Sequence, residues 1–175
     1  MKKWLNKIYR LKNKYREKED YMEIVLHNPD TDEEIITLID KEDFVKVNKY
    51  TWRISKNGYV INRQVGYLHR YLLNPPSKLD VDHISRDKLD NRRSNLRACT
   101  RSQNSMNTKI PSSNTSGVKG VYKCKTTGRW ATEIKVNGKK IWLGRYNTLD
   151  EAREVRAKAE EKYFKDFRYK PIEVD

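Results

Sequence analysis

Short β-type runs are the feature that most restricts how this chain can fold. Between residues 21 and 73 they read EIVLHN, EIITLID, YTWRIS, GYVINR and VGYLHRYLL, and turn-forming residues separate them. The dipeptide Asn57-Gly58 between two of these runs is a strong signal for a hairpin. Because a chain of 175 residues can bury only modest cores, we expect small α+β domains rather than one large layered core.

A segment of small polar residues then divides the chain. Residues 109–117, KIPSSNTSG, have the composition of a linker. We therefore predict a basic N-terminal arm at 1–20, a first domain at 21–110, a linker at 111–117 and a second domain at 118–175.

The region after the linker predicts a three-stranded meander followed by one helix. The strand-like runs are VKGVYKC, RWATEIKV and KKIWLGRY, and Thr148 and Glu151 have the spacing of a capping box at the start of TLDEAREVRAKAEEKYF. One apolar stripe follows this helix, formed by Leu149, Ala152, Val155, Ala159 and Tyr163. We expect the helix to cover one face of the sheet, although an Ala-rich stripe of this kind also suits a partner helix.

The charge of the chain favours a polyanionic partner. Lys and Arg number 38 against 24 Asp and Glu, which gives a formal net charge of +14. Nucleic acid is the first candidate, and a solvated basic surface without a partner is the alternative.

The first 20 residues carry eight basic residues against three acids. Apolar residues recur among them at helical spacing, so we expect a short helix or an arm that orders on nucleic acid; these residues are Trp4, Ile8, Leu11 and Tyr15. A basic arm lying on a membrane surface is the alternative. The stretch has neither the apolar core of a signal peptide nor the length to span a bilayer.

The two cysteines, Cys99 and Cys124, lie in different segments and form no CxxC pair. This spacing argues against a zinc knuckle or a disulfide framework and favours reduced, intracellular thiols. We expect a cytoplasmic, nucleoid-associated protein of phage or bacterial intracellular origin.

The stretch VDHISRDKLDNRRSNLRACTRSQNSMN, residues 81–107, holds the candidate site. A strand over 81–83 and a second near 96–99 would form a ribbon, and a capping box of Thr100 and Gln103 would start a helix. Asn104 would lie in the first turn of that helix. If the helix packs on the ribbon, Asp82 and Asn104 converge on one cation, and His83 faces the cleft.

The residue types limit the chemistry of such a site. Carboxylate and amide oxygens are hard ligands, which suit one Mg²⁺ or Mn²⁺ with water and phosphate oxygens completing the shell. A neutral His83 is suited to take a proton from water attacking phosphorus, and Asn95 is suited to fix the loop or ring that orients it. The alternative is that Asp82, Asn95 and Asn104 are ordinary turn, loop and cap residues.

These residues resemble the HNH nucleases, whose ββα-metal fold consists of a ribbon, a helix and one divalent cation. The resemblance covers roughly residues 60–108 and includes Leu68-His69-Arg70, which is similar to the strand before the motif in the phage and intron-encoded homing branch. By matched position it implies that Asp82 and Asn104 bind the metal, His83 is the general base and Asn95 positions His83. The last motif residue is often histidine in the family, and Asn104 is similar to the homing branch. His27 and His69 are interpreted as structural histidines.

The second region resembles the APETALA2-type DNA-binding domain in Gly120-Val121-Tyr122, in the run from Trp130 to Ile134, and in Trp142-Leu143-Gly144. Residues 109–145 carry nine basic residues against the single acid Glu133, a density suited to phosphate contact. We assign Trp130 to the core. The predicted DNA-contacting residues are Lys119, Tyr122, Arg129, Lys135, Lys140 and Trp142. Lysines where the plant domains carry arginine imply looser reading of guanine.

The resemblance implies a metal-dependent endonuclease that cuts one strand of double-stranded DNA and leaves a 5′ phosphate and a 3′ hydroxyl. We expect it to act as a monomer, with one divalent cation, no small-molecule cofactor and no membrane partner. A non-enzymatic DNA-binding transcriptional regulator and an RNA-binding protein are the alternatives. Residues 21–60 have no assigned role at this stage.

Overall fold

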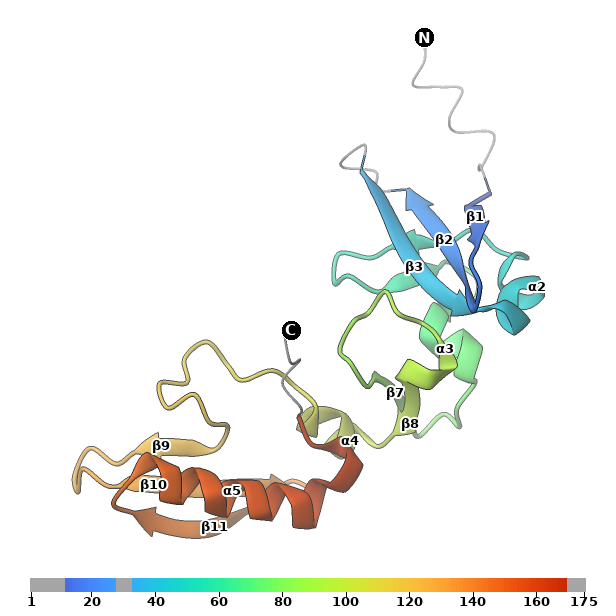
Figure 1. Ribbon diagram of the computed structural model, residues 1–175. Coiled ribbons are helices and arrows are strands. Elements are labelled where there is room, and N and C mark those ends of the chain that lie inside the picture. The colour runs from blue at the N-terminus through green and yellow to red at the C-terminus, as the bar shows by residue number, and fades with distance from the viewer. Residues whose placement is uncertain (1–11, 28–32, 170–175) are drawn as a thin grey trace. The chain divides into compact units, whose positions relative to one another are not determined.

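The computed structural model describes residues 12–27 and 33–169, and the chain divides into two compact units, residues 1–98 and 99–175 (Figure 1). Each unit combines a small sheet with short helices and has its own hydrophobic cluster. The predicted α+β class is therefore confirmed. No helix among the described residues is long and apolar enough to cross a membrane.

The first unit is built on a mainly antiparallel sheet of six short strands. Its strands are β1 (Lys14–Glu17), β2 (Tyr21–His27), β3 (Glu34–Asp40), β4 (Arg53–Ile54), β5 (Val60–Asn62) and β6 (Gly66–Tyr67). They follow the order β1-β2-β4-β5-β6, and β3 pairs with β2 over its whole length. The hairpin predicted at Asn57-Gly58 is confirmed, since β4 and β5 pair antiparallel and Gly58 has a φ of +77° in the turn.

Three short helical segments follow strands of this sheet: η1 (Lys41–Asp43), α2 (Phe44–Val47) and α3 (Leu68–Leu73). Its core surrounds Trp52, whose indole nitrogen donates to the carbonyl of Val47 at 3.0 Å. A buried tryptophan needs such a partner for its N–H group.

Two sequence predictions in this unit were wrong. The run VGYLHRYLL is a strand only at Gly66–Tyr67 and then continues as α3, because Leu68 and Leu72 at helical spacing both enter the core. The predicted N-terminal helix does not reach Tyr15, which lies in β1 and packs edge-on against Phe44 with ring centroids 5.1 Å apart. Residues 1–11, with the rest of that predicted helix, lie outside the described residues.

The predicted ribbon is confirmed as a two-stranded sheet of β7 (Asp80–His83) and β8 (Leu96–Cys99). A 3-10 turn, η2 (Arg93–Asn95), leads from the connecting loop into β8. The helix α4 (Arg101–Met106) starts at Thr100 with both hydrogen bonds of the predicted capping box. The two units meet between Ala98 and Cys99, before the predicted linker, because Met106 of α4 belongs to the second core.

The second unit is the predicted meander with its helix. The strands β9 (Val121–Lys123), β10 (Trp130–Val136) and β11 (Lys139–Tyr146) form one sheet in the order β11-β10-β9, and the helix α5 (Leu149–Phe164) lies along it before a short turn, η3 (Lys165–Phe167) (Figure 1). Thr148 and Glu151 make the capping box predicted for α5. Ile134, Ala159 and Phe164 form the core with Met106.

The sequence did not predict that a charged residue of α5 would be enclosed in this unit. Arg156 is buried, donates from Nε to Glu160 at 2.9 Å, and donates from Nη1 to the carbonyl oxygen of Glu133. Gly120, with a φ of +74°, lets the backbone pass beside this guanidinium, since a Cβ atom there would collide with it. Gly120 and the buried Arg156 thus determine how α5 packs against the sheet.

Candidate functional site

The ribbon places two of the predicted site residues side by side at the end of β7. Asp82 and His83 are both buried, and His83 is only 4% exposed. We expected His83 to face a cleft, whereas its ring is covered by protein. Asn95 ends η2, directly before β8, so the ribbon and its loop bring these three residues into one region.

Asp82 is paired with an arginine of the neighbouring strand. Both Nε and Nη2 of Arg97 donate to Oδ2 of Asp82, at 2.9 and 2.7 Å. The side chains of both residues are largely buried, so this ion pair is screened little by solvent. A carboxylate oxygen is a suitable hard ligand for a divalent cation.

The donor chemistry around Asp82 fits a cation of the magnesium type better than zinc. Among residues 12–27 and 33–169, no three His, Cys, Asp or Glu side chains are grouped so that they could hold a metal ion together. Zinc normally requires three or four nitrogen or sulfur ligands, whereas Mg²⁺ keeps several waters and needs only one or two protein oxygens. The residues present thus fit a sparsely ligated, oxygen-bound ion.

Asn104 lies on α4, in the second unit. Its backbone amide donates to the carbonyl of Thr100 at 2.9 Å, so it is held in the first turn of that helix, as predicted. Joint binding of one cation by Asp82 and Asn104 stays a prediction.

The imidazole of His83 has a side-chain partner that sequence reasoning missed. Its Nε2 lies 3.2 Å from Oδ1 of Asn91, a residue that is 1% exposed. The rings of His69 and Tyr59 pack beside it, with centroids 5.0 and 6.0 Å away. Asn91 stands within the motif string Asp90-Asn91-Arg92, but nothing in its spacing indicated that its amide would meet the histidine.

Burial keeps the imidazole of His83 neutral. Loss of solvent lowers the pKa of His83 below its ordinary value, although the hydrogen bond to Asn91 and the nearby carboxylate of Asp82 oppose this change. A general base must be deprotonated before it can accept a proton, so this direction suits the predicted role.

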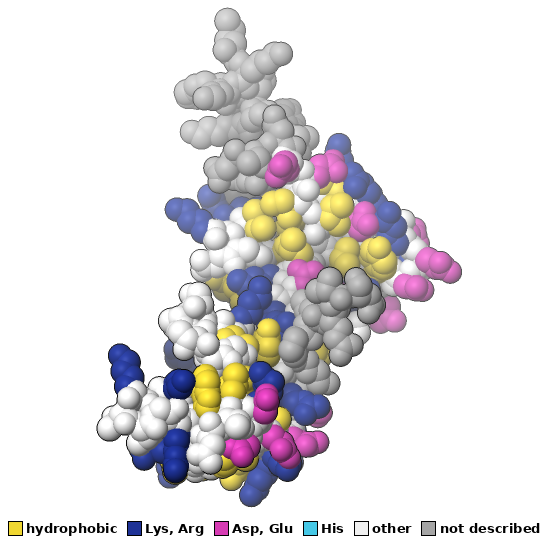
Figure 2. Space-filling model, turned by 60° about the vertical axis from the view of Figure 1, so that its left-hand side comes forward, with side chains coloured by type: hydrophobic (Ala, Val, Ile, Leu, Met, Phe, Trp, Pro, Cys, Tyr) yellow, Lys and Arg dark blue, Asp and Glu magenta, His cyan; other side chains and the backbone are white. Residues whose placement is uncertain are grey.

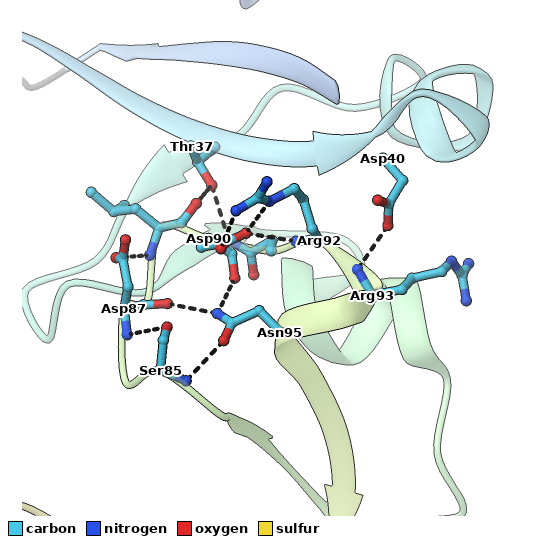
Figure 3. A network of polar contacts seen from close by, with 10 residues as sticks. Thr37, Asp40, Ser85, Asp87, Asp90, Arg92, Arg93 and Asn95 are labelled. Carbon is cyan, nitrogen blue, oxygen red and sulfur yellow. Dashed lines mark hydrogen bonds and ion pairs between the residues drawn. The ribbon is translucent and has the colours of Figure 1, made fainter. Parts of the chain in front are cut away.

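Asn95 holds the loop instead of the ring. Its Oδ1 accepts from the backbone amide of Ser85 at 2.8 Å, and its Nδ2 donates to the carbonyl of Asp90 at 2.8 Å. Figure 3 shows the side chain of Asn95 pointing into the loop beside Ser85 and Asp87. Both alternatives for Asn95, fixing the loop and fixing the ring, were open from the sequence; in the structure its side-chain hydrogen bonds are with the loop.

His69 lies on α3, and its buried ring packs beside that of His83. Its Nδ1 is buried and has no hydrogen-bond partner, and burial, followed by the nearby His83, lowers the pKa of His69 to about 3. It therefore remains a neutral, packed histidine at physiological pH. The side chain of His27 lies outside the described part of the chain.

The neutral state of His69 predicts that stability falls in mild acid. The unfolded chain binds a proton at this residue near pH 6.5, whereas the folded chain does so only near pH 3, so acid favours unfolding between these values. We expect the unfolding free energy to drop by about 1.4 kcal/mol more in the unaltered chain than in His69→Phe between pH 7.5 and 5.5. Urea titrations of both chains measure this, and equal pH dependence would contradict the assignment.

The second unit presents a basic face on the side of its sheet away from α5. Ile134 points into the core with α5, so its neighbours Glu133 and Lys135 point the other way, together with their cross-strand partners Trp142 and Lys140. Tyr122 also faces away, since its neighbour Val121 is buried.

Several predicted DNA-contacting residues are therefore exposed on one sheet face. Trp142 is 52% exposed, Tyr122 is 46% exposed, and Arg129 is exposed just before β10. Figure 2 shows dark-blue Lys and Arg side chains standing out from the surface of the second unit. Positive charge beside exposed aromatic rings is suited to contacts with phosphates and bases.

Other residues of this unit deviate from the expected arrangement. The ammonium group of Lys119 donates to the carbonyl and hydroxyl oxygens of Thr108, at 2.8 and 2.7 Å, so it supports the turn after α4. Lys140 is paired with Glu133 at 2.7 Å. Trp130 was assigned to the core but is only half-buried, and the ammonium of Lys123 lies 5.8 Å from the centre of its ring.

Comparison with known proteins gives two matching family models. The HNH endonuclease model matches residues 74–106, which include the ribbon and α4, and the AP2 domain model matches residues 116–162, which include the meander and most of α5. No solved structure matches the chain.

Two curated proteins are similar to this chain. "Uncharacterized HNH endonuclease L560" of Acanthamoeba polyphaga mimivirus is 34% identical over 129 residues, which cover 69% of this chain. "Protein 3.8" of Escherichia phage T7 is 38% identical over 64 residues, which cover 37% of this chain. The matched regions span 66% and 53% of the lengths of these two relatives. With the ribbon, the loop asparagine and the buried histidine in place, these matches show that the chain belongs to the HNH endonuclease family and carries an AP2 domain after its HNH segment.

Proposed function

We propose that this protein is a metal-dependent DNA endonuclease that nicks one strand of a duplex at a site bound by its C-terminal sheet. The observation that carries the proposal is the adjacency of Asp82 and a buried His83, whose pKa is lowered by burial, at the end of one strand inside the matched HNH segment. A base beside a hard oxygen ligand is the combination that phosphodiester hydrolysis requires.

In the proposed reaction His83 accepts a proton from the water that attacks phosphorus. The new bond joins the water oxygen to phosphorus, and the bond from phosphorus to the 3′ oxygen breaks. The products are a 5′ phosphate and a 3′ hydroxyl, once the leaving oxygen has taken a proton from solvent. Because each chain has one such base, one strand is cut in each encounter.

Asp82 and Asn104 would hold one Mg²⁺ or Mn²⁺. When bound, this cation supplies positive charge that stabilises the phosphate and the leaving oxygen. Arg97 holds the carboxylate of Asp82 in position with two hydrogen bonds from the neighbouring strand. Asn95 fixes the loop that follows β7, so the direction of the strand end and its two side chains is constrained.

The sheet face of the second unit would bind the duplex. Its exposed rings and cations can contact bases and phosphates in the major groove, a surface on which β-sheets place side chains in several DNA-binding folds. Tyr122, Lys135 and Trp142 are the residues of this face that the proposal depends on most. We propose that the protein works as a monomer, with its DNA in the cytoplasm of the cell.

A non-enzymatic DNA-binding regulator is the second candidate, and the burial of His83 favours it. A ring that is 4% exposed must become reachable for water and phosphate before it can act as a base. In a regulator, the HNH segment would only support the DNA-binding sheet.

Nicking of supercoiled plasmid separates the two candidates. We expect the unaltered chain to convert supercoiled DNA to open circles with Mg²⁺ or Mn²⁺ and to leave it intact with a chelator. End-mapping should find 5′ phosphates. Tight binding to duplex DNA without any metal-dependent nicking would favour the regulator, and tighter binding to structured RNA than to duplex DNA would contradict both.

A further inference from the structure

A chain of buried polar contacts links the N-terminal sheet to the imidazole of His83. The hydroxyl of Thr37, a residue of β3 that is 0% exposed, lies 2.6 Å from the carbonyl of Leu89 and 2.9 Å from Nδ2 of Asn91. Nδ2 of Asn91 also lies 3.1 Å from the carbonyl of Lys88, and Oδ1 of Asn91 lies 3.2 Å from Nε2 of His83. Thr37 and Asn91 are 54 positions apart in the sequence.

The donors and acceptors of this chain admit only one arrangement. The carbonyl of Leu89 can only accept, so the hydroxyl of Thr37 uses its hydrogen there and offers a lone pair to Asn91. The carbonyl of Lys88 also only accepts. Both neighbours therefore need the NH₂ group of Asn91, which leaves its Oδ1 facing the histidine.

The same argument fixes the proton on the ring of His83. An oxygen acceptor at Nε2 requires Nε2 to carry the hydrogen. In a neutral imidazole the lone pair then lies on Nδ1, whatever surrounds that nitrogen. The nitrogen that can accept a proton is thus determined by a threonine on a distant strand.

The backbone around Asn91 is held by the same strand. The amide of Leu38 donates to the carbonyl of Leu89 at 2.8 Å, and the amide of Asn91 donates to the carbonyl of Leu38 at 2.9 Å. The amide of Arg93 donates to the carboxylate of Asp40 at 2.7 Å, and Figure 3 shows Thr37 and Asp40 of β3 above this loop. The loop therefore cannot shift relative to β3 without breaking several of these hydrogen bonds.

We infer that Asn91 and Thr37 are positioning residues that hold His83 in its Nε2–H tautomer, so that Nδ1 is the nitrogen that accepts the proton. This inference rests on the proposed function for its catalytic meaning, but the tautomer itself is a property of the protein without DNA. The inference also gives residues 21–60 a role in the nuclease site, which the sequence did not indicate. The strand β3 supplies Thr37, the member of the chain of contacts that lies farthest from His83.

Nitrogen NMR of the full-length chain, labelled in its histidines, reads the tautomer directly. The sequence has three histidines, and loss of a signal in His83→Gln assigns the ring. At pH 8 we expect protonated Nε2 and unprotonated Nδ1 in the unaltered chain. A ring that carries its proton on Nδ1 there would overturn the inference.

Two variants test whether the contacts set this state. Asn91→Ala and Thr37→Val should shift His83 toward a mixture of tautomers, and Thr37→Ser, which keeps the hydroxyl, should restore the single form. Nitrogen shifts that stay unchanged in both disruptive variants would overturn the inference. Because the unaltered chain is decisive by itself, poor folding of a variant does not leave the question open.

Nicking kinetics give the second readout. Asn91→Ala should lower kcat by about 10- to 100-fold with little change in KM, because the lost contact orients a catalytic group and the side chain of Asn91 is itself buried. The matched control is Ser85→Ala, which removes a hydrogen bond to the amide of Asp87 in the same loop and leaves Asn91 untouched. An equal loss of kcat in this control would contradict a specific role for Asn91. Absence of nicking in the unaltered chain, together with the expected tautomer, would overturn the proposed function alone.

Discussion

His83→Ala is expected to lower the rate of metal-dependent nicking by about 10²- to 10⁴-fold, the usual range for loss of a general base. The substitution removes the ring that would accept the proton of the attacking water, while the ion pair between Asp82 and Arg97 is kept. DNA affinity should change little, because the proposed DNA contacts lie in the second unit. Initial rates of plasmid nicking, with binding measured separately, test this expectation.

Two controls make the result specific. Added imidazole should restore part of the activity of His83→Ala, because the small base can enter the space left by the ring. His27→Gln removes a histidine of the same unit and should nick at the unaltered rate. Nicking by His83→Ala at an undiminished rate would contradict the assignment of His83 as the general base and would favour the non-enzymatic DNA-binding regulator.

The second large effect is expected from the sheet face of the second unit. Replacement of Arg129, Lys135 and Lys140 by alanine should lower the affinity for duplex DNA by on the order of tenfold or more at physiological salt. Each phosphate contact contributes about 0.9 to the slope of log affinity against log salt, so the slope should fall by about 2.7. The contribution of Lys140 to this slope should be smaller, because its ammonium group is already paired with Glu133.

A charge-matched variant on the opposite side of the unit is the control. Arg153, Lys158 and Lys162 are exposed on α5, and their replacement by alanine removes the same three positive charges. A salt titration should show a much smaller change for the α5 variant. Equal losses of DNA affinity in both variants would mean that binding depends on net charge alone and that the sheet face is not the binding surface.

The nuclease segment is not a self-sufficient module in this protein. The loop between β7 and β8 is bonded to β3 through backbone amides and through Thr37, and Arg93 reaches Asp43 with two hydrogen bonds of 2.9 and 2.7 Å. Removal of the N-terminal sheet would take away these partners, including the hydroxyl of Thr37 that accepts from the buried amide of Asn91. The β-rich region before the motif is thus part of the structural support of the site.

Elements with local signals could be predicted from the sequence. The strands β3 and β11 lie at the predicted runs EIITLID and KKIWLGRY, and the capping boxes at Thr100 and Thr148 are present as their spacing indicated. These features depend on hydrogen bonds between residues three or four positions apart, or on side chains that alternate along one strand. The adjacency of Asp82 and His83 on β7 is local in the same sense.

Only the tertiary structure decided which partners those residues meet. Asn91 instead of Asn95 contacts the ring of His83. The run beginning at Leu68 is a helix because it packs on a core. Arg156 of α5 is buried and donates to the carbonyl of Glu133 on β10. The helix at Leu68 and the enclosure of Arg156 depend on groups that are far apart along the chain. Asn91 and His83 are only 8 positions apart, but their contact depends on the conformation of the loop between β7 and β8, which β3 holds through Thr37. The sequence by itself determined the chemistry that the site contains, and packing between distant segments determined how its atoms are oriented, because hydrogen-bond partners are selected by proximity in the folded chain.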